Sequence, residues 1–244
     1  MKESEKIAIL DEEEDFLENT KLSVIDRFIL SKELNYEELL NETFTVFTSS
    51  QEASAKISAF LLLMMAYHPE YQEKLYKEII SVMGTTKTQV SQEDLRKMVY
   101  LDMVYKEVLR LFPIGALIQR TVMEDIEISS GMMPAGCSLV APLYHILRDA
   151  RFWERPDEFD PERFNLENTK KRQPNCFIPF SLGPMDCLGR YYGTKLIKTL
   201  CVQVLRHYRL SSQRSYRDLR LVIAVSVAPV DDYKLILTPR DESE

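Results

Sequence analysis

A cysteine between two glycines is the strongest candidate for chemistry in this sequence. Cys187 lies in "FIPFSLGPMDCLGR", residues 177–190, with Gly183 before it and Gly189 after it. Glycine lets a backbone turn sharply or lie close against a flat ligand. A helix is predicted to follow, and the N–H groups of its first turn favour a thiolate over a thiol. Such a thiolate is a nucleophile or a metal ligand; the alternative is that Cys187 is a small buried apolar residue.

A second candidate is an acid–base pair in "KEVLRLF". Glu107 and Arg110 are three residues apart, so they share one face of a helix. The apolar residues around them indicate partial burial, and a buried pair needs further partners. Arg163 in "PERF" is one candidate partner. The alternative is a solvated ion pair of little energetic weight.

Other kinds of site find little support. The three histidines, His68, His145 and His207, lack a recognisable base-and-orienter setting, and we expect each to be structural. The four cysteines include no CxxC pair, which disfavours a structural zinc site, and they indicate reduced thiols.

A net charge of -7 disfavours nucleic-acid binding. The longest apolar run, residues 59–67, is too short to span a bilayer, and the acidic N-terminus does not read as a signal peptide.

The elements that must position these residues are mostly helical. Helices are predicted over residues 22–30, 35–68, 69–84, 91–98, 100–112 and about 188–208. Pro69 and Gly84 are expected to begin and end one helix, and Ser91 with Asp94 forms a capping signal for the next.

The second half also carries a minor β part. Short β-branched runs separated by turn signals, residues 117–122, 125–128 and 137–142, predict a small sheet of hairpins. Residues 148–164 show little periodicity, and the chain ends in two strand-like runs, 219–228 and 233–239. We predict one mainly α domain over residues 1–244. Its parts are the core helices (35–113), the small sheet and Pro/Arg-rich segment (114–170), the cysteine loop (171–190) and a helix with terminal strands (191–244).

Together and in this order, these motifs resemble the C-terminal half of a cytochrome P-450, a haem-thiolate monooxygenase. The cysteine loop of that family, Phe-x-x-Gly-x-Arg-x-Cys-x-Gly, is here "FSLGPMDCLG", with Phe180, Gly183, Cys187 and Gly189 in register. The Glu-x-x-Arg helix of the family is "EVLR", and its arginine segment is "PERF". "RLFP" followed by "IQR" matches the segment whose arginine, here Arg120, contacts a haem propionate. The details look most like the microsomal family-four branch of insects.

The resemblance implies a site and a reaction. Cys187 would be the axial ligand of haem iron, in a non-covalently bound haem b, and its electron donation favours O–O cleavage. Glu107, Arg110 and Arg163 would be a structural charge network that braces the loop. The reaction would be hydroxylation of a lipophilic substrate such as a fatty acid or xenobiotic. O₂ would be the oxidant and an NADPH-dependent flavoprotein reductase the electron donor, at the cytosolic face of the endoplasmic reticulum membrane.

The sequence departs from the family pattern at both sides of the expected haem. Met185 replaces the loop arginine that pairs with a propionate. On the distal helix, Ser49, Gln51 and Glu52 stand where the family has a glycine and an acid–threonine pair. Glu52 is therefore our candidate for proton delivery, and a polar surface turn is the alternative. Thr48 stands where some family-four enzymes have a haem-linking glutamate, so no covalent link is expected.

Two expectations concern the whole chain. Family members are much longer, so the resemblance predicts a truncated form without the membrane-anchoring N-terminal half. A non-catalytic fragment or degenerate copy that keeps the fold remnant is the alternative to a monooxygenase. A basic patch near Cys187, made of Arg190, Lys195, Lys198 and Arg206, would dock the reductase; the alternative is simply a charged helix face.

Overall fold

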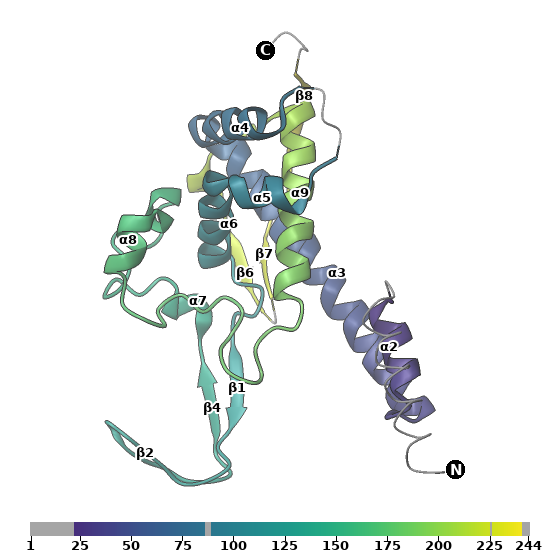
Figure 1. Ribbon diagram of the computed structural model, residues 1–244. Helices are drawn as coiled ribbons and strands as arrows, with labels where there is room; N and C mark the ends of the chain where they lie inside the picture. The colour runs from purple at the N-terminus through teal and green to yellow at the C-terminus, as the bar shows by residue number, and fades with distance from the viewer. Residues whose placement is uncertain (1–21, 86–88, 225, 241–244) are drawn as a thin grey trace. The chain divides into compact units, whose positions relative to one another are not determined.

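The computed structural model describes residues 22–85, 89–224 and 226–240. The described chain is mainly helical with a minor strand part, which confirms the predicted fold class (Figure 1). It divides into two compact units, Met1–Glu52 and Ala53–Glu244. In the part of the chain that the structure describes, no helix has both the length and the apolar character to span a membrane.

Local signals set the helix boundaries. The helices are α2 (Val24–Ser31), α3 (Tyr36–Tyr67), α4 (Pro69–Met83), α5 (Gln92–Lys97), α6 (Val99–Leu111), α7 (Leu143–Ile146), α8 (Leu166–Lys171) and α9 (Arg190–His207), with 3-10 turns η1 (Pro161–Phe164) and η2 (Tyr216–Asp218). Pro69 opens α4, and Gly84 ends it with a φ of 65°. Ser91 and Asp94 form the predicted capping box of α5. The short helices α7 and α8 were not predicted, and α7 places His145 on a helix rather than in the hairpin region.

The strands form antiparallel two-stranded ladders. The pairs are β1 (Ile118–Thr121) with β4 (Ser138–Ala141), β2 (Ile126–Ile128) with β3 (Gly131–Met133), β5 (Tyr208–Ser211) with β8 (Ile236–Pro239), and β6 (Leu221–Ile223) with β7 (Val227–Pro229). The predicted hairpins between residues 117 and 142 are confirmed. The prediction of one strand over residues 219–228 is wrong, because that run contains both β6 and the start of β7, folded back on each other.

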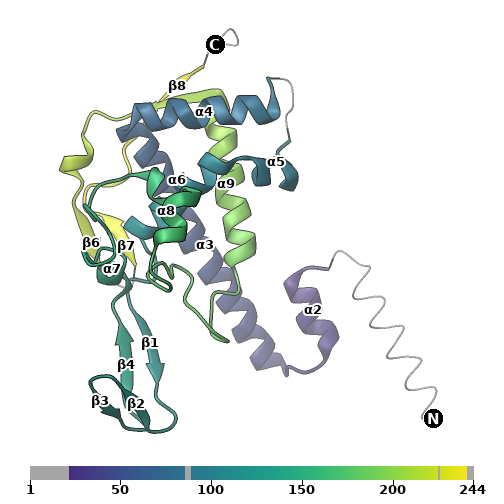
Figure 2. The same cartoon turned by 60° about the vertical axis from the view of Figure 1, so that its left-hand side comes forward.

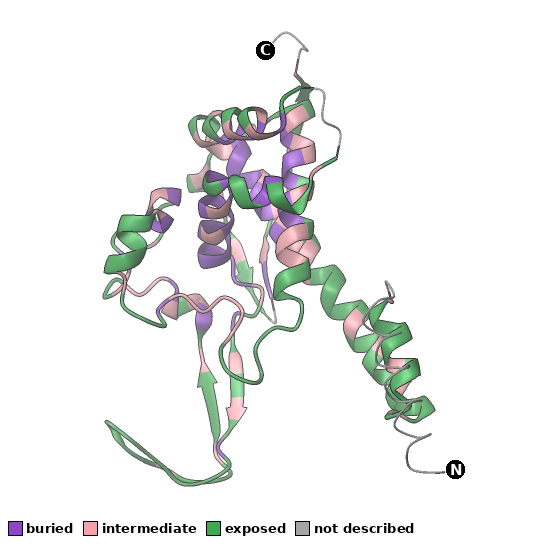
Figure 3. Cartoon of the chain, viewed as in Figure 1, coloured by how far each residue is buried: buried purple, intermediate pink, exposed green. Residues whose placement is uncertain are grey.

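The core of the second unit lies among α4, α6, α9 and the C-terminal part of α3. Phe60 of α3 stacks on Phe112, just after α6, with ring centroids 4.1 Å apart. The buried Gln72 side chain bonds the Met65 carbonyl and both backbone groups of Leu210, which ties α4 to α3 and β5. Figure 2 shows α4 lying across one end of α9, and Figure 3 shows α6 almost entirely buried. Each large apolar side chain buried here contributes roughly 1.5–3 kcal/mol, so α6 is firmly fixed.

Candidate functional site

An ion pair with no exposure to solvent lies on α6. Glu107 and Arg110 are both 0% exposed, and they form a two-point contact with N–O distances of 2.7 and 2.8 Å. The remaining guanidinium N–H groups donate to the main-chain carbonyls of Leu147, Pro156 and Glu158, at 3.0, 2.7 and 3.1 Å. All five N–H groups of the guanidinium therefore have acceptors. The alternative of a solvated pair does not describe this structure.

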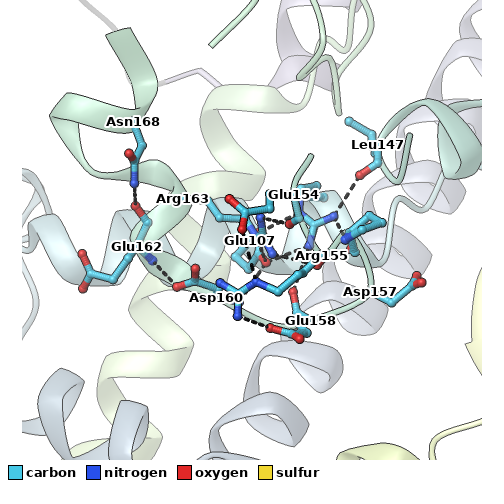
Figure 4. Close-up of polar contacts among 12 residues, drawn as sticks. Glu107, Leu147, Glu154, Arg155, Asp157, Glu158, Asp160, Glu162, Arg163 and Asn168 are labelled. Carbon is cyan, nitrogen blue, oxygen red and sulfur yellow. Dashed lines mark hydrogen bonds and ion pairs between the residues drawn. The ribbon is translucent and has the colours of Figure 1, made fainter. Parts of the chain in front are cut away.

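Further groups complete the carboxylate side of this cluster (Figure 4). Glu107 Oε1 accepts a hydrogen bond from the Asp160 backbone N–H at 2.9 Å and lies 3.4 Å from Arg163 Nε. Arg163 also donates to the carbonyls of Glu154 and, at 2.8 Å, Arg155. Burial raises the pKa of the Glu107 carboxyl, while the surrounding arginines and the backbone N–H act in the opposite direction. We call Glu107, Arg110 and Arg163 the charge network.

The charge network has the properties of a brace. It joins α6 to the segment between α7 and η1, which has little regular structure and leads towards the cysteine loop. Its groups are buried and hydrogen-bonded to backbone, so they cannot reach a substrate. Breaking such a pair leaves an uncompensated buried charge, which makes the contact costly to lose.

The cysteine loop, predicted over residues 171–190, is residues 172–189 in the structure, between α8 and α9, and it has the opposite character. Cys187 is exposed, so the alternative of a buried apolar cysteine is wrong. Its backbone N–H donates to the Phe180 carbonyl at 3.0 Å, and its carbonyl accepts from the Arg190 N–H at 3.3 Å. Gly183 has a φ of 80°, as expected for a sharp turn. Gly189 has a φ of -78°, so the backbone conformation there does not require glycine, and its predicted role in a sharp turn is wrong; its role in letting the backbone lie close against a flat ligand stays a prediction.

Two side chains from the neighbouring elements β1 and α9 stabilise the conformation of the loop. Arg120 of β1 donates from Nη2 to Ser181 Oγ at 2.9 Å and to the Met185 carbonyl at 3.1 Å. Arg190, the first residue of α9, pairs with Asp186 at 2.9 Å. The structure thus brings Arg120, predicted only from the family resemblance, into direct contact with the loop that carries Cys187.

The surface of the loop is apolar around the thiol. Leu182, Met185 and Leu188 are 51, 72 and 85% exposed. A Cβ at Gly183 would meet nothing within 4 Å, and one at Gly189 would lie 3.8 Å from Cys187 Sγ. A thiol and apolar side chains on one loop, with the Arg120 guanidinium of β1 in contact with that loop, suit a flat apolar ligand that carries both a metal and carboxylates.

A buried tyrosine lies near the thiol and was missed by the sequence reasoning. Tyr105 of α6 is 3% exposed, and its hydroxyl lies 3.1 Å from Thr194 Oγ1 of α9. Burial raises the pKa of Tyr105 to about 12, and the nearby Cys187 acts in the same direction. Tyr105 sits in an apolar helical pattern, so nothing in the sequence distinguished it from an ordinary core residue.

The predicted basic patch is wrong in one member. Lys198 is 7% exposed and bonds Asp102 at 2.6 Å, so it belongs to the interior between α6 and α9. The other members are bonded as well: Arg190 pairs with Asp186, Lys195 donates to the Gln92 side chain, and Arg206 donates to the carbonyls of Gly84 and Thr85. Docking of a reductase on Arg190, Lys195 and Arg206 stays a prediction, with a charged helix face as its alternative.

The distal-side candidates lie on α3, in the first unit. Glu52 is exposed. The hydroxyls of Thr48 and Ser49 donate back to the carbonyls of Phe44 and Thr45, at 2.8 and 2.7 Å. The role of Glu52 in proton delivery stays a prediction. Within the described residues, no group of three or more His, Cys, Asp or Glu side chains is arranged to hold a metal ion.

Comparison with known proteins places these features in a family. The family model for cytochrome P450 matches residues 2–228. Cytochrome P450 4c3 of Drosophila melanogaster is 32% identical over 226 residues, which cover 91% of this chain and 42% of that protein. Cytochrome P450 4V2 of Pongo abelii is 33% identical over 211 residues, covering 86% and 40%. Cytochrome P450 3A31 of Mesocricetus auratus is 29% identical over 211 residues, covering 86% and 42%. The chain spans about two fifths of the length of these relatives.

Proposed function

This chain belongs to the cytochrome P450 family, and on that premise we propose that it binds haem through Cys187 as part of a haem-thiolate monooxygenase. The observation that carries the proposal is the cysteine loop. Cys187 is exposed on a loop whose backbone is fixed by the bond from its N–H to the Phe180 carbonyl. A metal ligand has to be both reachable and held in place, and Cys187 meets both requirements.

The residues around the thiol fit haem b in charge and polarity. Haem is a flat apolar ring with two carboxylates and a metal centre. Cys187 would supply the metal ligand, and Leu182 and Leu188 would supply apolar contacts. Arg120 donates to one hydroxyl and to main-chain carbonyls, all of which are neutral acceptors. Its positive charge is therefore available to a carboxylate.

Bound haem would supply the oxidising centre, and thiolate ligation favours O–O cleavage. The protein's own residues have separate tasks. Cys187 provides the thiolate, and Arg120 orients a carboxylate of the ring. Tyr105, whose pKa is raised to about 12, stays neutral at physiological pH and adds no second anion beside the thiolate. The charge network holds the segment that leads into the loop.

The proposal includes the usual partners of the family. The oxidant would be O₂, the electron donor an NADPH-dependent flavoprotein reductase, and the substrate a lipophilic molecule such as a fatty acid or xenobiotic. Glu52 would assist proton delivery, and a Glu52→Ala variant with normal turnover would remove it from that role. The site would face the cytosol at the endoplasmic reticulum membrane, where the full-length family acts.

A second candidate function is a non-catalytic protein that keeps the fold remnant. Met185 supports it, because an exposed, uncharged side chain stands where the family's loop carries an arginine. Haem uptake without turnover, in the presence of reductase and a fatty acid, would favour this candidate over the monooxygenase.

A spectroscopic experiment tests haem binding independently of turnover. The full chain is mixed with haem, reduced and exposed to carbon monoxide. We expect a strongly red-shifted Soret band, which reports thiolate ligation, and we expect Cys187→Ser to abolish it. The matched control is Cys137→Ser, since Cys137 lies in the hairpin region and should leave the band unchanged. Failure of the chain to take up haem would contradict the proposed function.

A further inference from the structure

One side chain joins two parts of the chain that lie about sixty residues apart in sequence. The guanidinium of Arg120, on strand β1, donates from one nitrogen to both Ser181 Oγ and the Met185 carbonyl. These acceptors stand at the two ends of a tight turn that contains Leu182, Gly183 and Pro184. Arg120 therefore links the two ends of the turn through hydrogen bonds from a side chain outside it.

The backbone conformation of this turn requires stabilising contacts from outside the turn. Ser181 has a φ of 65°, a left-handed conformation that residues other than glycine rarely adopt. Gly183 follows at 80°. The turn has local hydrogen bonds from the Ser181 N–H to Ile178 and from the Asp186 N–H to Gly183, at 3.0 and 3.1 Å. Strain of this kind persists only where surrounding contacts determine the conformation.

The turn also sets the position of the thiol. Phe180 lies directly before Ser181, and its carbonyl accepts the Cys187 N–H at 3.0 Å. Other side-chain contacts in this stretch are the packing of Phe180 against the core, the Arg190 guanidinium 5.5 Å from the centre of the Phe180 ring, and the Asp186–Arg190 pair, whose members are 41 and 48% exposed. An exposed pair of this kind holds a loop weakly. The contact of Arg120 with Ser181 is partly buried, whereas its contact with the Met185 carbonyl is exposed, so the Ser181 contact restrains the turn more than either exposed contact does.

We propose that Arg120 and Ser181 form a latch that positions Cys187 by tying the turn between residues 181 and 185 to strand β1. The latch acts on the backbone of residue 185, where Met185 offers no charge of its own. Arg120 and Ser181 are positioning residues in this role, acting through the loop and not on the reacting atoms. The relevance of the latch to haem rests on the proposed function, whereas the latch itself is a property of the chain without haem.

Hydrogen exchange on the full chain, without added haem, tests the latch directly. The measured quantities are the exchange rate of the backbone amides in residues 178–189 and the alkylation rate of Cys187 by iodoacetamide, read by peptide mapping. We expect Arg120→Met to speed exchange of the Cys187 N–H about 10-fold, because two hydrogen bonds from a charged donor are lost. Ser181→Ala, which loses one of them, should speed it about 3-fold.

Two further variants separate the hydroxyl from the backbone. Ser181→Gly removes the same hydroxyl but suits the positive φ, so the latch predicts faster exchange here as well. If Ser181→Gly exchanges no faster than the parent chain while Ser181→Ala does, the backbone conformation and not the Arg120 contact controls the loop, and the latch is wrong. Arg151→Met is the matched control, since Arg151 bonds Asp149 on the surface and should not alter residues 178–189.

The outcomes of this test and of the haem test are independent. Unchanged exchange and alkylation in Arg120→Met, with an intact circular-dichroism spectrum, would overturn the latch whatever the chain does with haem. Faster exchange in a chain that takes up no haem would support the latch and contradict the proposed function. Faster exchange together with a less complete Soret shift in Ser181→Ala, which keeps the Arg120 charge for a haem carboxylate, would support both.

Discussion

The charge network and the cysteine loop differ in almost every physical property, although both belong to the second compact unit. Glu107 and Arg110 are 0% exposed, and Arg110 has an acceptor for every guanidinium N–H. Cys187 is exposed, and its backbone is held by bonds to Phe180 and Arg190. Charged side chains therefore build the buried part, and a cysteine side chain lies on the accessible part.

The difference separates stability from chemistry along the chain. A buried ion pair with many backbone partners is costly to break and cannot reach a ligand. An exposed cysteine contributes little to packing and is free to coordinate. We therefore expect the Glu-x-x-Arg motif to serve stability and the cysteine motif to serve ligand binding. Single substitutions in the two motifs should accordingly change different measured properties.

The largest effect on the free energy of unfolding is expected for Glu107→Gln. The variant keeps the size of the side chain but leaves Arg110 buried with a neutral partner, at a cost of about 3–5 kcal/mol. That is a large part of the stability of an ordinary domain. Urea unfolding followed by circular dichroism measures the loss, or a strongly reduced soluble yield reports it.

The matched control is Glu167→Gln on α8. Glu167 pairs with Lys171 at 2.6 Å, and both side chains are largely exposed, so the expected change is within about 0.5 kcal/mol. Equal effects of the two variants would show that burial does not distinguish the charge network, and the contrast between the two regions would fail.

Much of the fold could be predicted because its signals are local. The ends of α4 were predicted from Pro69 and Gly84, and the start of α5 from Ser91 and Asp94. The strand β5 was missed because its four residues follow α9 directly, without a turn signal, and pairing with β8 makes them extended. The hydrophobic periodicity of a short segment does not indicate which distant strand it will pair with.

The site could be predicted in its residues but not in its contacts. The types and spacing of Glu107, Arg110 and Cys187 stand out in the sequence, whereas the carbonyl partners of Arg110 come from an irregular segment whose path depends on the fold. Lys198 shows the same limit. Its sequence neighbours indicated a surface cation, and packing of α9 against α6 buried it against Asp102.

A smaller effect is expected on the pH dependence of the free energy of unfolding. It should come from His68, which lies close to the charge network. His68 stacks on Phe159, next to Asp160, and its Nε2 is buried without a hydrogen-bond partner among the described residues. Burial lowers the pKa of His68 below 6.5. As the pH falls through 6.5, the unfolded chain takes up a proton before the folded chain does. The free energy of unfolding should therefore decrease from about pH 7.5 towards pH 5 until the lowered folded pKa is passed.

Two variants test this origin in opposite directions. His68→Phe should remove this part of the pH dependence in urea unfolding. Glu70→Gln should extend the decrease to lower pH, because Glu70, with a carboxylate oxygen 3.4 Å from Nδ1, opposes the effect of burial on the pKa of His68. A His68→Phe variant with the same slope as the parent chain would place the pH dependence elsewhere.

The smallest effect on stability is expected for Cys187→Ser, the substitution with the largest expected effect on haem binding. The side chain is exposed, and the hydrogen bond to Phe180 comes from the backbone N–H, which serine retains. Surface substitutions of this kind usually change the free energy of unfolding by no more than about 0.5 kcal/mol. Urea unfolding of the chain without haem measures this. A loss above about 2 kcal/mol would mean that Cys187 is part of the packing, and the division between a stabilising network and a coordinating loop would not hold.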